Sequence, residues 1–405
     1  MEVAKLGSMT KRKICYGIVQ PGESVVDGIP VIKVNNIIAG LRDVSELDTT
    51  KKENDEKYSR TRLKGGELLL SVVGTIGKTA VVPMGFAGCN LVRATALIDI
   101  PDSQMTKWVK YYIDSPKGQY YIHENLNTTV QPTLNIKSIV DMPIPLFSNE
   151  YMEKATRILS SLDDKIELNR RINANLEAQA QALFKSWFVD FEPFRDGEFV
   201  ESELGMIPKG WRVGSLSDIA SINPTRSIKK GDKATYLDMK NMPTSGPFPL
   251  LCETKEYTGG MRFQNQDTLM ARITPCLEKG KVAYVNFLEE KEIAFGSTEY
   301  IVMTTKDGFL PELLYFLCRD EYFKGYATKN MNGSSGRQRV SGETIGNYKI
   351  PLPPRSLLEP IAPYFKSVMD TIRNNGFESR RLATLRDTLL PRLMSGEIKV
   401  GDVTL

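Results

Sequence analysis

The sequence predicts an α+β protein with a pseudo-twofold internal repeat, in which two similar mixed α/β globular domains are separated by two long antiparallel helices that form an intramolecular coiled coil. Three observations predict this fold: a tandem repeat with an offset of about 206 residues, long stretches with helical periodicity, and short apolar runs separated by glycine and proline. A chain of 405 residues is long enough for two or three domains with separate cores.

The repeat is clearest where each copy passes from its mixed part into its long helix. Residues 131–146 match residues 337–352 in pattern, and both segments end in Ile-Pro-Leu. The match continues without a gap into the helices, where Leu162 corresponds to Val368. Two copies of one module predict two similar sites, or one pseudo-twofold site.

Each copy begins with a mixed part in which short apolar runs alternate with turn residues, as is typical of strands. We expect strands at 29–34, 67–73 and 94–100 in the first copy, and at 267–273, 281–287 and 299–304 in the second. A single helix is expected after each set of strands, at 106–124 and at 310–326.

Each copy ends in a long helix with a coiled-coil seam. Residues 150–188 contain neither proline nor glycine, and their apolar residues recur in steps of mostly three and four. The second helix is expected from about 363 to 394, with a weak point at Asn374-Asn375-Gly376. The duplicate supplies a partner for each helix without a second chain, although a scaffold that only dimerises remains an alternative. The seam residues are Leu162, Ile166, Leu176, Leu183, Trp187, Leu382, Leu389 and Leu393.

These elements divide the chain into four parts. The division is 1–149 for the first mixed domain, 150–195 for the central long helix, 196–354 for the second mixed domain, and 355–405 for the distal long helix and C-terminal tail.

The composition excludes several classes of catalytic and metal site. His123 is the single histidine, so the chain alone cannot build a zinc site with two or three imidazoles. The five cysteines are widely spaced and form no Cys-x-x-Cys pair, which fits a reducing cytoplasm better than a disulfide framework. We find no apolar run long enough for a membrane span and expect a cytoplasmic protein. A net charge of +4 is compatible with a polyanionic partner.

Two segments resemble catalytic motifs without completing them. Residues 74–79 look like a phosphate-binding loop, but that motif needs a glycine where this chain has Val72. The segment also lies between two predicted strands, so a turn in a sheet is the better interpretation, with Lys78 as a phosphate contact. Glu253 and Lys255, with Asp238 upstream, imitate the carboxylate–lysine set of a nuclease. A stand-alone nuclease or NTPase is therefore the enzymatic alternative.

The remaining signal is a binding surface. Two polar loops, 125–131 and 330–339, precede the long helices at matching positions. Arginine pairs with guanine and asparagine or glutamine with adenine, while lysine, serine and threonine suit phosphates. The candidate DNA-binding residues are Lys11, Arg12, Lys13, Arg60, Arg62, Lys78, Asn127, Thr128, Thr129, Gln131, Arg226, Lys229, Lys230, Ser334, Ser335, Arg337, Gln338 and Arg339.

At this point the chain resembles the specificity subunit of type I DNA restriction–modification systems. Residues 204–211 (Leu-Gly-Met-Ile-Pro-Lys-Gly-Trp) resemble the beginning of that family's target recognition domain, and residues 350–354 resemble its end. Residues 162–191 resemble the family's central helix, and residues 389–398 resemble its distal one. The first domain departs from the pattern, because it lacks the Ile-Pro-x-Gly-Trp beginning.

The resemblance implies a chain without catalytic activity of its own. Its two target recognition domains would each read part of a split site in double-stranded DNA. The helices that carry the seam would dock two methyltransferase subunits, and motor-nuclease subunits would join the complex. S-adenosylmethionine, ATP and Mg would be bound by those partner subunits, and this chain would bind no cofactor or metal.

Overall fold

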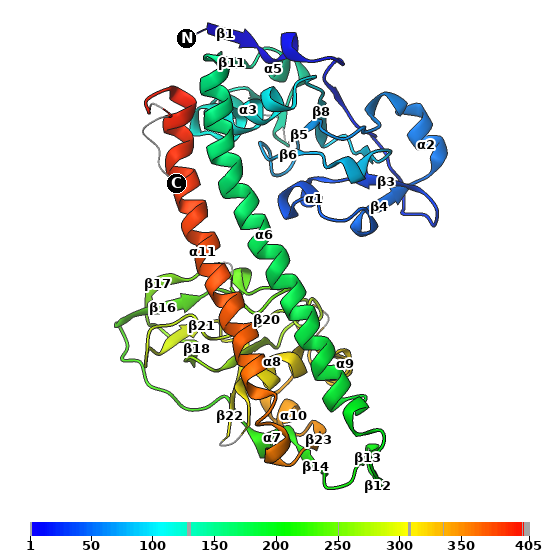
Figure 1. Cartoon of the computed structure of the whole chain (residues 1–405), viewed down its shortest axis with the longest axis vertical. Coiled ribbons are helices and arrows are strands. Elements are labelled where there is room, and N and C mark those ends of the chain that lie inside the picture. The colour runs from blue at the N-terminus through cyan, green and yellow to red at the C-terminus, as the bar shows by residue number, and fades with distance from the viewer. Residues whose placement is uncertain are drawn as a thin grey trace. The chain divides into compact units, whose positions relative to one another are not determined.

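In a computed structural model, each copy of the repeat folds into a mixed α/β part with a similar arrangement of strands, followed by a long helix (Figure 1). The structure describes residues 2–127, 131–249, 251–306, 309–334, 336–398 and 400. The chain divides into two compact units. The first unit is Met1–Asp164 with Leu382–Leu405, and the second unit is Lys165–Arg381.

The first unit contains a four-stranded sheet, a three-stranded sheet and a strand pair. The four-stranded sheet has the order β2 (Cys15–Tyr16), β8 (Thr95–Ile98), β5 (Leu68–Ser71), β6 (Thr79–Val81). The three-stranded sheet has the order β4 (Asp48–Thr50), β3 (Ile29–Ile32), β7 (Asn90–Leu91), with β3 and β7 parallel. The pair joins β1 (Glu2–Lys5) to β11 (Pro143–Leu146). Its short helices are α1 (Val34–Ala39), α2 (Lys52–Lys57), α3 (Ser103–Asp114), α4 (Pro116–Glu124) and α5 (Ile136–Val140).

The second unit repeats this topology and adds one strand to its second sheet and a separate hairpin. Its first sheet has the order β15 (Ala220–Ile222), β22 (Tyr300–Thr305), β19 (Thr268–Ala271), β20 (Val282–Tyr284). Its second sheet has the order β17 (Glu253–Glu256), β16 (Lys233–Leu237), β21 (Ala294–Gly296), β18 (Met261–Phe263), and β16 is again parallel to β21. The strand pair is β14 (Arg212–Ser215) with β23 (Lys349–Leu352), and β12 (Phe199–Ser202) and β13 (Gly205–Pro208) form a separate hairpin. Its short helices are α7 (Leu216–Ile219), α8 (Pro311–Arg319), α9 (Glu321–Lys329) and α10 (Gly342–Gly346).

The two long helices are α6 (Asn149–Phe188) and α11 (Ala362–Ser395). In the first unit, Tyr151 near the start of α6 donates to the carbonyl of Leu393 near the end of α11. In the second unit, Asn173 of α6 donates to the carbonyl of Ile372 in the earlier part of α11. The helices are therefore antiparallel, and the predicted fold class is confirmed. The predicted domain boundaries stay predictions.

The central strand of each four-stranded sheet is buried on both faces. Leu68 and Leu70 of β5 pack with Trp108 and the long helices, whereas Leu69 packs with Ile32 of the other sheet. Successive strand residues point to opposite faces, so a continuous apolar run is what this position requires. In the second unit, β19 places Met270 toward the helices and its neighbours toward the second sheet.

The single helix predicted at 106–124 is wrong, because two helices, α3 and α4, occupy that stretch. The break falls at Ser115-Pro116, where proline disfavours helical backbone in the residue before it and Ser115 caps the new helix. The prediction at 310–326 fails in the same way. There Asp320 caps α9 by accepting from the backbone N–H groups of Tyr322 and Phe323.

The weak point predicted at Asn374-Asn375-Gly376 is also wrong, because α11 continues through it. A Cβ on Gly376 would lie 2.6 Å from the ring of Phe248. Glycine is therefore what lets this aromatic ring lie directly on the helix. Arg380, one turn further along, stacks over the same ring at 4.4 Å.

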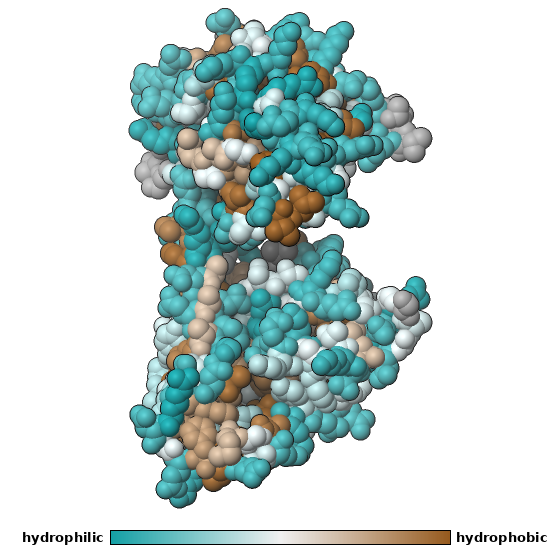
Figure 2. Space-filling model, turned by 90° about the vertical axis from the view of Figure 1, so that its right-hand side faces the viewer, coloured by the Kyte–Doolittle hydropathy of each residue, from teal (hydrophilic) through white to brown (hydrophobic). Residues whose placement is uncertain are grey.

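On the face drawn in Figure 2 the surface is mostly hydrophilic, with apolar side chains in small groups. Among the residues that the structure describes, every helix is too short or too polar to cross a membrane.

Candidate nucleic-acid interface

The two polar loops are presented at the same place in both units. In the first unit, β9 (Leu126–Asn127) pairs with β10 (Thr133–Leu134), and Thr133 also bridges to Val73 just after the central strand. In the second unit, Arg339 bridges both to Asn332 and to Ile273, which again follows the central strand. The sequence match between the loops therefore corresponds to one structural position.

Matching asparagines fix the point at which each loop leaves its helix. Asn125 donates from its side chain to the carbonyl of Tyr121, and Asn330 does the same to Tyr326, both at 2.9 Å. These bonds satisfy a carbonyl in the last turn of each helix. The two asparagines consequently serve the fold and leave recognition to the residues further along each loop.

In the first loop, Asn127 and Gln131 are exposed. Thr128 and Thr129, which were also predicted to contact DNA, lie outside the described residues, as does Ser335 of the second loop. The DNA contacts predicted for these residues stay predictions.

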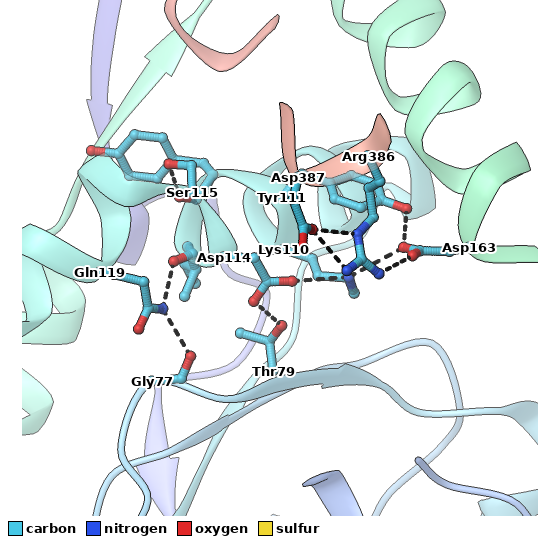
Figure 3. Close-up of polar contacts among 12 residues, drawn as sticks. Gly77, Thr79, Lys110, Tyr111, Asp114, Ser115, Gln119, Asp163, Arg386 and Asp387 are labelled. Atoms are coloured by element: carbon cyan, nitrogen blue, oxygen red, sulfur yellow. Dashed lines mark hydrogen bonds and ion pairs between the residues drawn. The ribbon is translucent and has the colours of Figure 1, made fainter. Parts of the chain in front are cut away.

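The segment 74–79 connects the antiparallel strands β5 and β6, which confirms the predicted sheet turn. A phosphate-binding loop needs a strand followed by a helix. Gln119 of α4 supports the turn by donating to the carbonyl of Gly77 at 2.9 Å (Figure 3). Gly77 has a φ of +85°, which favours glycine. The side chain of Lys78 remains exposed beside this turn.

The second loop separates an exposed arginine from a fixed one. Arg337 is exposed, and its backbone N–H closes a turn onto the carbonyl of Ser334 at 3.0 Å. Arg339 donates from two nitrogens to the carboxylate of Glu299, at 2.7 to 2.9 Å, and its side chain is 41% exposed. These hydrogen bonds lower the pKa of Glu299. Within the described residues, Arg337 has no ion-pair partner, so it is the better candidate for a base contact. Gln338 is tied by its backbone to Thr274.

Two of the predicted DNA-binding arginines form ion pairs with buried carboxylates. Arg12 pairs with Glu67 at 2.6 Å, and Arg226 pairs with Asp267 at 2.8 Å. Both carboxylates directly precede the central strand, and their side chains are 2% and 0% exposed. The Arg226 side chain is itself only 7% exposed. Both arginines therefore have a structural role in an ion pair, and the DNA contacts predicted for them stay predictions.

Arg62 is also held within the protein, where Asp55 and Glu56 accept hydrogen bonds from its guanidinium and raise its pKa. The remaining basic residues of the prediction are exposed. In the first unit, Arg12 donates to the carbonyl of Arg60 at 3.3 Å and so brings the segments 11–13 and 60–62 together. The exposed basic residues that the structure leaves available are Lys11, Lys13, Arg60, Lys229 and Lys230.

Sequence reasoning missed two basic residues beside the loops. Arg93 is exposed between β7 and β8, next to Ala94, whose carbonyl accepts from the N–H of Val72. Arg272 carries the carbonyl that accepts from Val340 at the base of the second loop. Both are isolated basic residues in or beside strands, so no cluster in the sequence marks them.

A polar network connects the mixed α/β part of the first unit to the long helices (Figure 3). Thr79, next to the turn, donates to Asp114 of α3 at 2.6 Å. Tyr111, on the same helix, donates to Asp163 of α6 at 2.8 Å, and Arg386 of α11 donates to the other oxygen of Asp163 at 2.7 Å. The turn that carries Lys78 is therefore connected to both long helices within the first unit.

The predicted docking residues on the seam face inward. In the first unit, Leu162, Leu389 and Leu393 are buried in the core and Leu382 packs against it. In the second unit, Leu176, Leu183 and Trp187 pack against the core, while Ile166 is partly buried. These side chains are occupied within the chain, as expected for a seam between the two helices, and the docking of subunits on the helices stays a prediction. The large hydrophobic residues that remain exposed on the long helices are Leu168, Ile172, Tyr364, Phe377 and Leu385.

The nuclease-like residues show no catalytic arrangement in the structure. Lys255 pairs with Glu253 at 2.9 Å and lies over the ring of Tyr236. Asp238 caps the turn at Met239–Asn241 by accepting from the N–H of Lys240. In the described part of the chain, no three His, Cys, Asp or Glu residues are grouped so that they could hold a metal ion.

Comparison with known proteins agrees with this architecture. Residues 3–178 and 208–379 match the family model of the type I restriction modification DNA specificity domain. The chain is 28% identical over 353 residues to the type I restriction enzyme MjaIX specificity subunit of Methanocaldococcus jannaschii, covering 82% of this chain and 79% of the relative. It is 23% identical over 361 residues to the HindI specificity subunit of Haemophilus influenzae, covering 73% and 75%. The S subunit of the type I restriction–modification system from M. genitalium superposes with a TM-score of 0.56 at 13% identity, covering 97% of this chain and 95% of that one, which shows a shared fold.

Proposed function

The chain belongs to the type I restriction modification DNA specificity family, and we propose from this premise that it reads a split target in double-stranded DNA as the non-catalytic subunit of a methyltransferase and endonuclease complex. One structural observation carries the proposal: two units whose first sheets have the same strand order hold a polar loop at the same position. Two equivalent readers fit a target made of two short half-sites.

Each reader combines groups that suit bases with groups that suit phosphates. In the first unit these are Asn127 and Gln131, with Lys78 beside them. In the second unit they are Arg337, with Lys229 and Lys230 on another exposed segment. Asparagine and glutamine pair bidentately with adenine and arginine with guanine, whereas the lysines add affinity independent of sequence.

We also propose that catalysis is supplied by partners that dock on the outer side of the long helices. The seam is filled from within the chain, so a partner has to use what remains exposed. On the second unit these are Leu168 and Ile172 of α6 and Phe377 of α11, which are 48%, 37% and 38% exposed. Two methyltransferase subunits with S-adenosylmethionine, and motor-nuclease subunits with ATP and Mg, are the partners that this family implies.

The test is methylation sequencing of DNA exposed to the chain reconstituted with its methyltransferase subunits. We expect one bipartite motif, with two short half-sites and a gap of fixed length. Arg337→Ala should relax one position of one half-site and leave the other half-site unchanged. Arg195→Ala, which removes an exposed arginine outside the loops, is the matched control. A contiguous motif, or methylation without sequence preference, would contradict the proposal.

A further inference from the structure

The helix pair contains a polar layer within the second unit, flanked by apolar packing. Asn169 of α6 donates from Nδ2 to Glu378 Oε2 at 2.7 Å and to Ser379 Oγ at 3.3 Å. One turn further along α6, Asn173 Oδ1 accepts from Asn375 Nδ2 at 2.8 Å. Lys165 completes the layer with an ion pair to Glu378 at 3.3 Å.

The contacts in this layer follow the internal repeat. The offset of 206 residues converts Asn169 into Asn375 and Asn173 into Ser379. It therefore converts the contact between Asn169 and Ser379 into the contact between Asn375 and Asn173, with the two helices exchanged. The pseudo-twofold axis of the helix pair therefore passes through the polar layer, where Asn169 contacts its own repeat equivalent, Asn375.

Burial makes this layer sensitive to the alignment of the helices. Asn169 is 1% exposed, and the hydrogen bonds of its Nδ2 all reach α11. Its Oδ1 is buried and has no partner among the described residues. A buried amide loses free energy when its partners are removed. A slide of α11 by one turn that places Leu382 and Ala383 where Glu378 and Ser379 now face Asn169 removes both side-chain acceptors.

We propose that this layer, centred on Asn169, locks the register of α6 against α11 and so determines which gap between half-sites the protein accepts. A buried asparagine in a helix seam is an effective way to specify one register among several apolar alternatives. A slide by one turn moves the helices by about 5.4 Å, which corresponds to one or two base pairs at about 3.4 Å each. The link to the gap between half-sites rests on the proposed function, whereas the lock on the helix register is independent of it.

The register is measured directly by cysteine crosslinking of the full chain. Asn173→Cys with Asn375→Cys reports the native register, because these side chains are in contact. Asn173→Cys with Ser379→Cys reports this slide of one turn, in which Ser379 replaces Asn375 opposite Asn173. With Asn169 intact, we expect crosslinks from the first pair alone, identified by mass spectrometry of the linked peptides. With Asn169→Leu added, the second pair should gain yield several-fold at the expense of the first.

The gap is measured on the reconstituted complex with a DNA library that keeps both half-sites and varies the distance between them. The unaltered chain should prefer one distance. Asn169→Leu should reduce that preference about tenfold or more and leave the half-site sequences unchanged. Asn175→Leu makes the same substitution on the exposed side of α6 and should change neither readout.

The outcomes separate the two proposals. An unaltered complex that shows no preferred distance overturns the proposed function, and the crosslinks still decide the register. A preferred distance that Asn169→Leu leaves unchanged overturns the link between the layer and the gap, and unchanged crosslinks overturn the lock itself. Asn169→Ala is tested in parallel, since alanine favours helix and fills less space. Loss of folding in both variants would also overturn the proposal, because it would show that Asn169 is needed for the fold as a whole.

Discussion

Arg226 donates to Asp267 from a guanidinium that is almost as deeply buried as the carboxylate it faces. Thr304 completes the set by donating to the same carboxylate and accepting from the same arginine. The corresponding set in the first unit is Arg12, Glu67 and Asp99, so each unit ties its central strand to a neighbouring strand through one arginine.

We predict that Arg226→Ala strongly destabilises the second unit. Removing one partner of a buried ion pair leaves an uncompensated charge and typically costs about 3–5 kcal/mol. Denaturant unfolding followed by tryptophan fluorescence measures the change. Arg337→Ala, which removes an exposed arginine from the same unit, should leave stability unchanged. Equal stabilities for the two variants would contradict the structural role.

We predict that Arg337 and Arg339 act differently on DNA. Arg337→Ala should lose about 1–3 kcal/mol of discrimination at one position of the target, because it removes a base contact. Arg339→Ala should instead weaken binding at every position of its half-site, because Arg339 holds the loop on Glu299. Fluorescence anisotropy with single-base variants of the target separates the two. The hypothesis would be wrong if the double variant kept both affinity and specificity.

We predict a pH dependence for the anchor of the second loop. The hydrogen bonds from Arg339 lower the pKa of Glu299 below its ordinary value of 4.5. A carboxyl group with a depressed pKa contributes stability that is fully present above its unfolded pKa and is lost as the pH falls through the folded value. The loop should therefore stay anchored at neutral pH and be released in acid. An NMR titration should find the pKa of Glu299 higher in Arg339→Ala than in the unaltered chain.

We predict that Gly376→Ala destabilises the protein, against the usual trend for glycine in a helix. Alanine normally stabilises a helix interior by roughly 0.5–1 kcal/mol over glycine. Here the added Cβ would meet the Phe248 ring at 2.6 Å, and overpacking of this kind typically costs about 1–3 kcal/mol. Thermal unfolding measures whether Gly376→Ala lowers or raises the stability of the protein. Phe248→Ala in the Gly376→Ala background should restore the usual gain.

We predict that lengthening both long helices lengthens the gap in the target. One insertion of four residues in α6 after Asn173, and another in α11 after Asn375, would each add about 6 Å of rise. The preferred gap should grow by one or two base pairs while the half-sites stay the same. Methylation mapping of the variant complex tests this. An active variant with the original gap would show that the helices do not set the distance.

The repeat, the long helices and the central strands β5 and β19 could be predicted from the sequence because they depend on local periodicity. The breaks at Ser115 and Asp320 were missed because the apolar stripe continues across a capped kink. The ion pairs of two arginines could not be predicted for a different reason. Arg12 and Arg226 lie in basic loops, and their carboxylate partners are 55 and 41 residues away, a pairing that only the tertiary fold creates.

Because α6 and α11 each contribute one part to either unit, the boundary at which a reading domain could be transplanted differs from the boundary at which its strands begin. Phe184 and Phe188 precede the second set of strands, yet they belong to the core of the second unit. A second domain transplanted with its junction at residue 196 would lack the part of α6 that covers its apolar face. Exchange of domains between relatives should succeed when the junctions lie inside the long helices, near 164 and 382, because each domain then keeps the helix segments that pack against it.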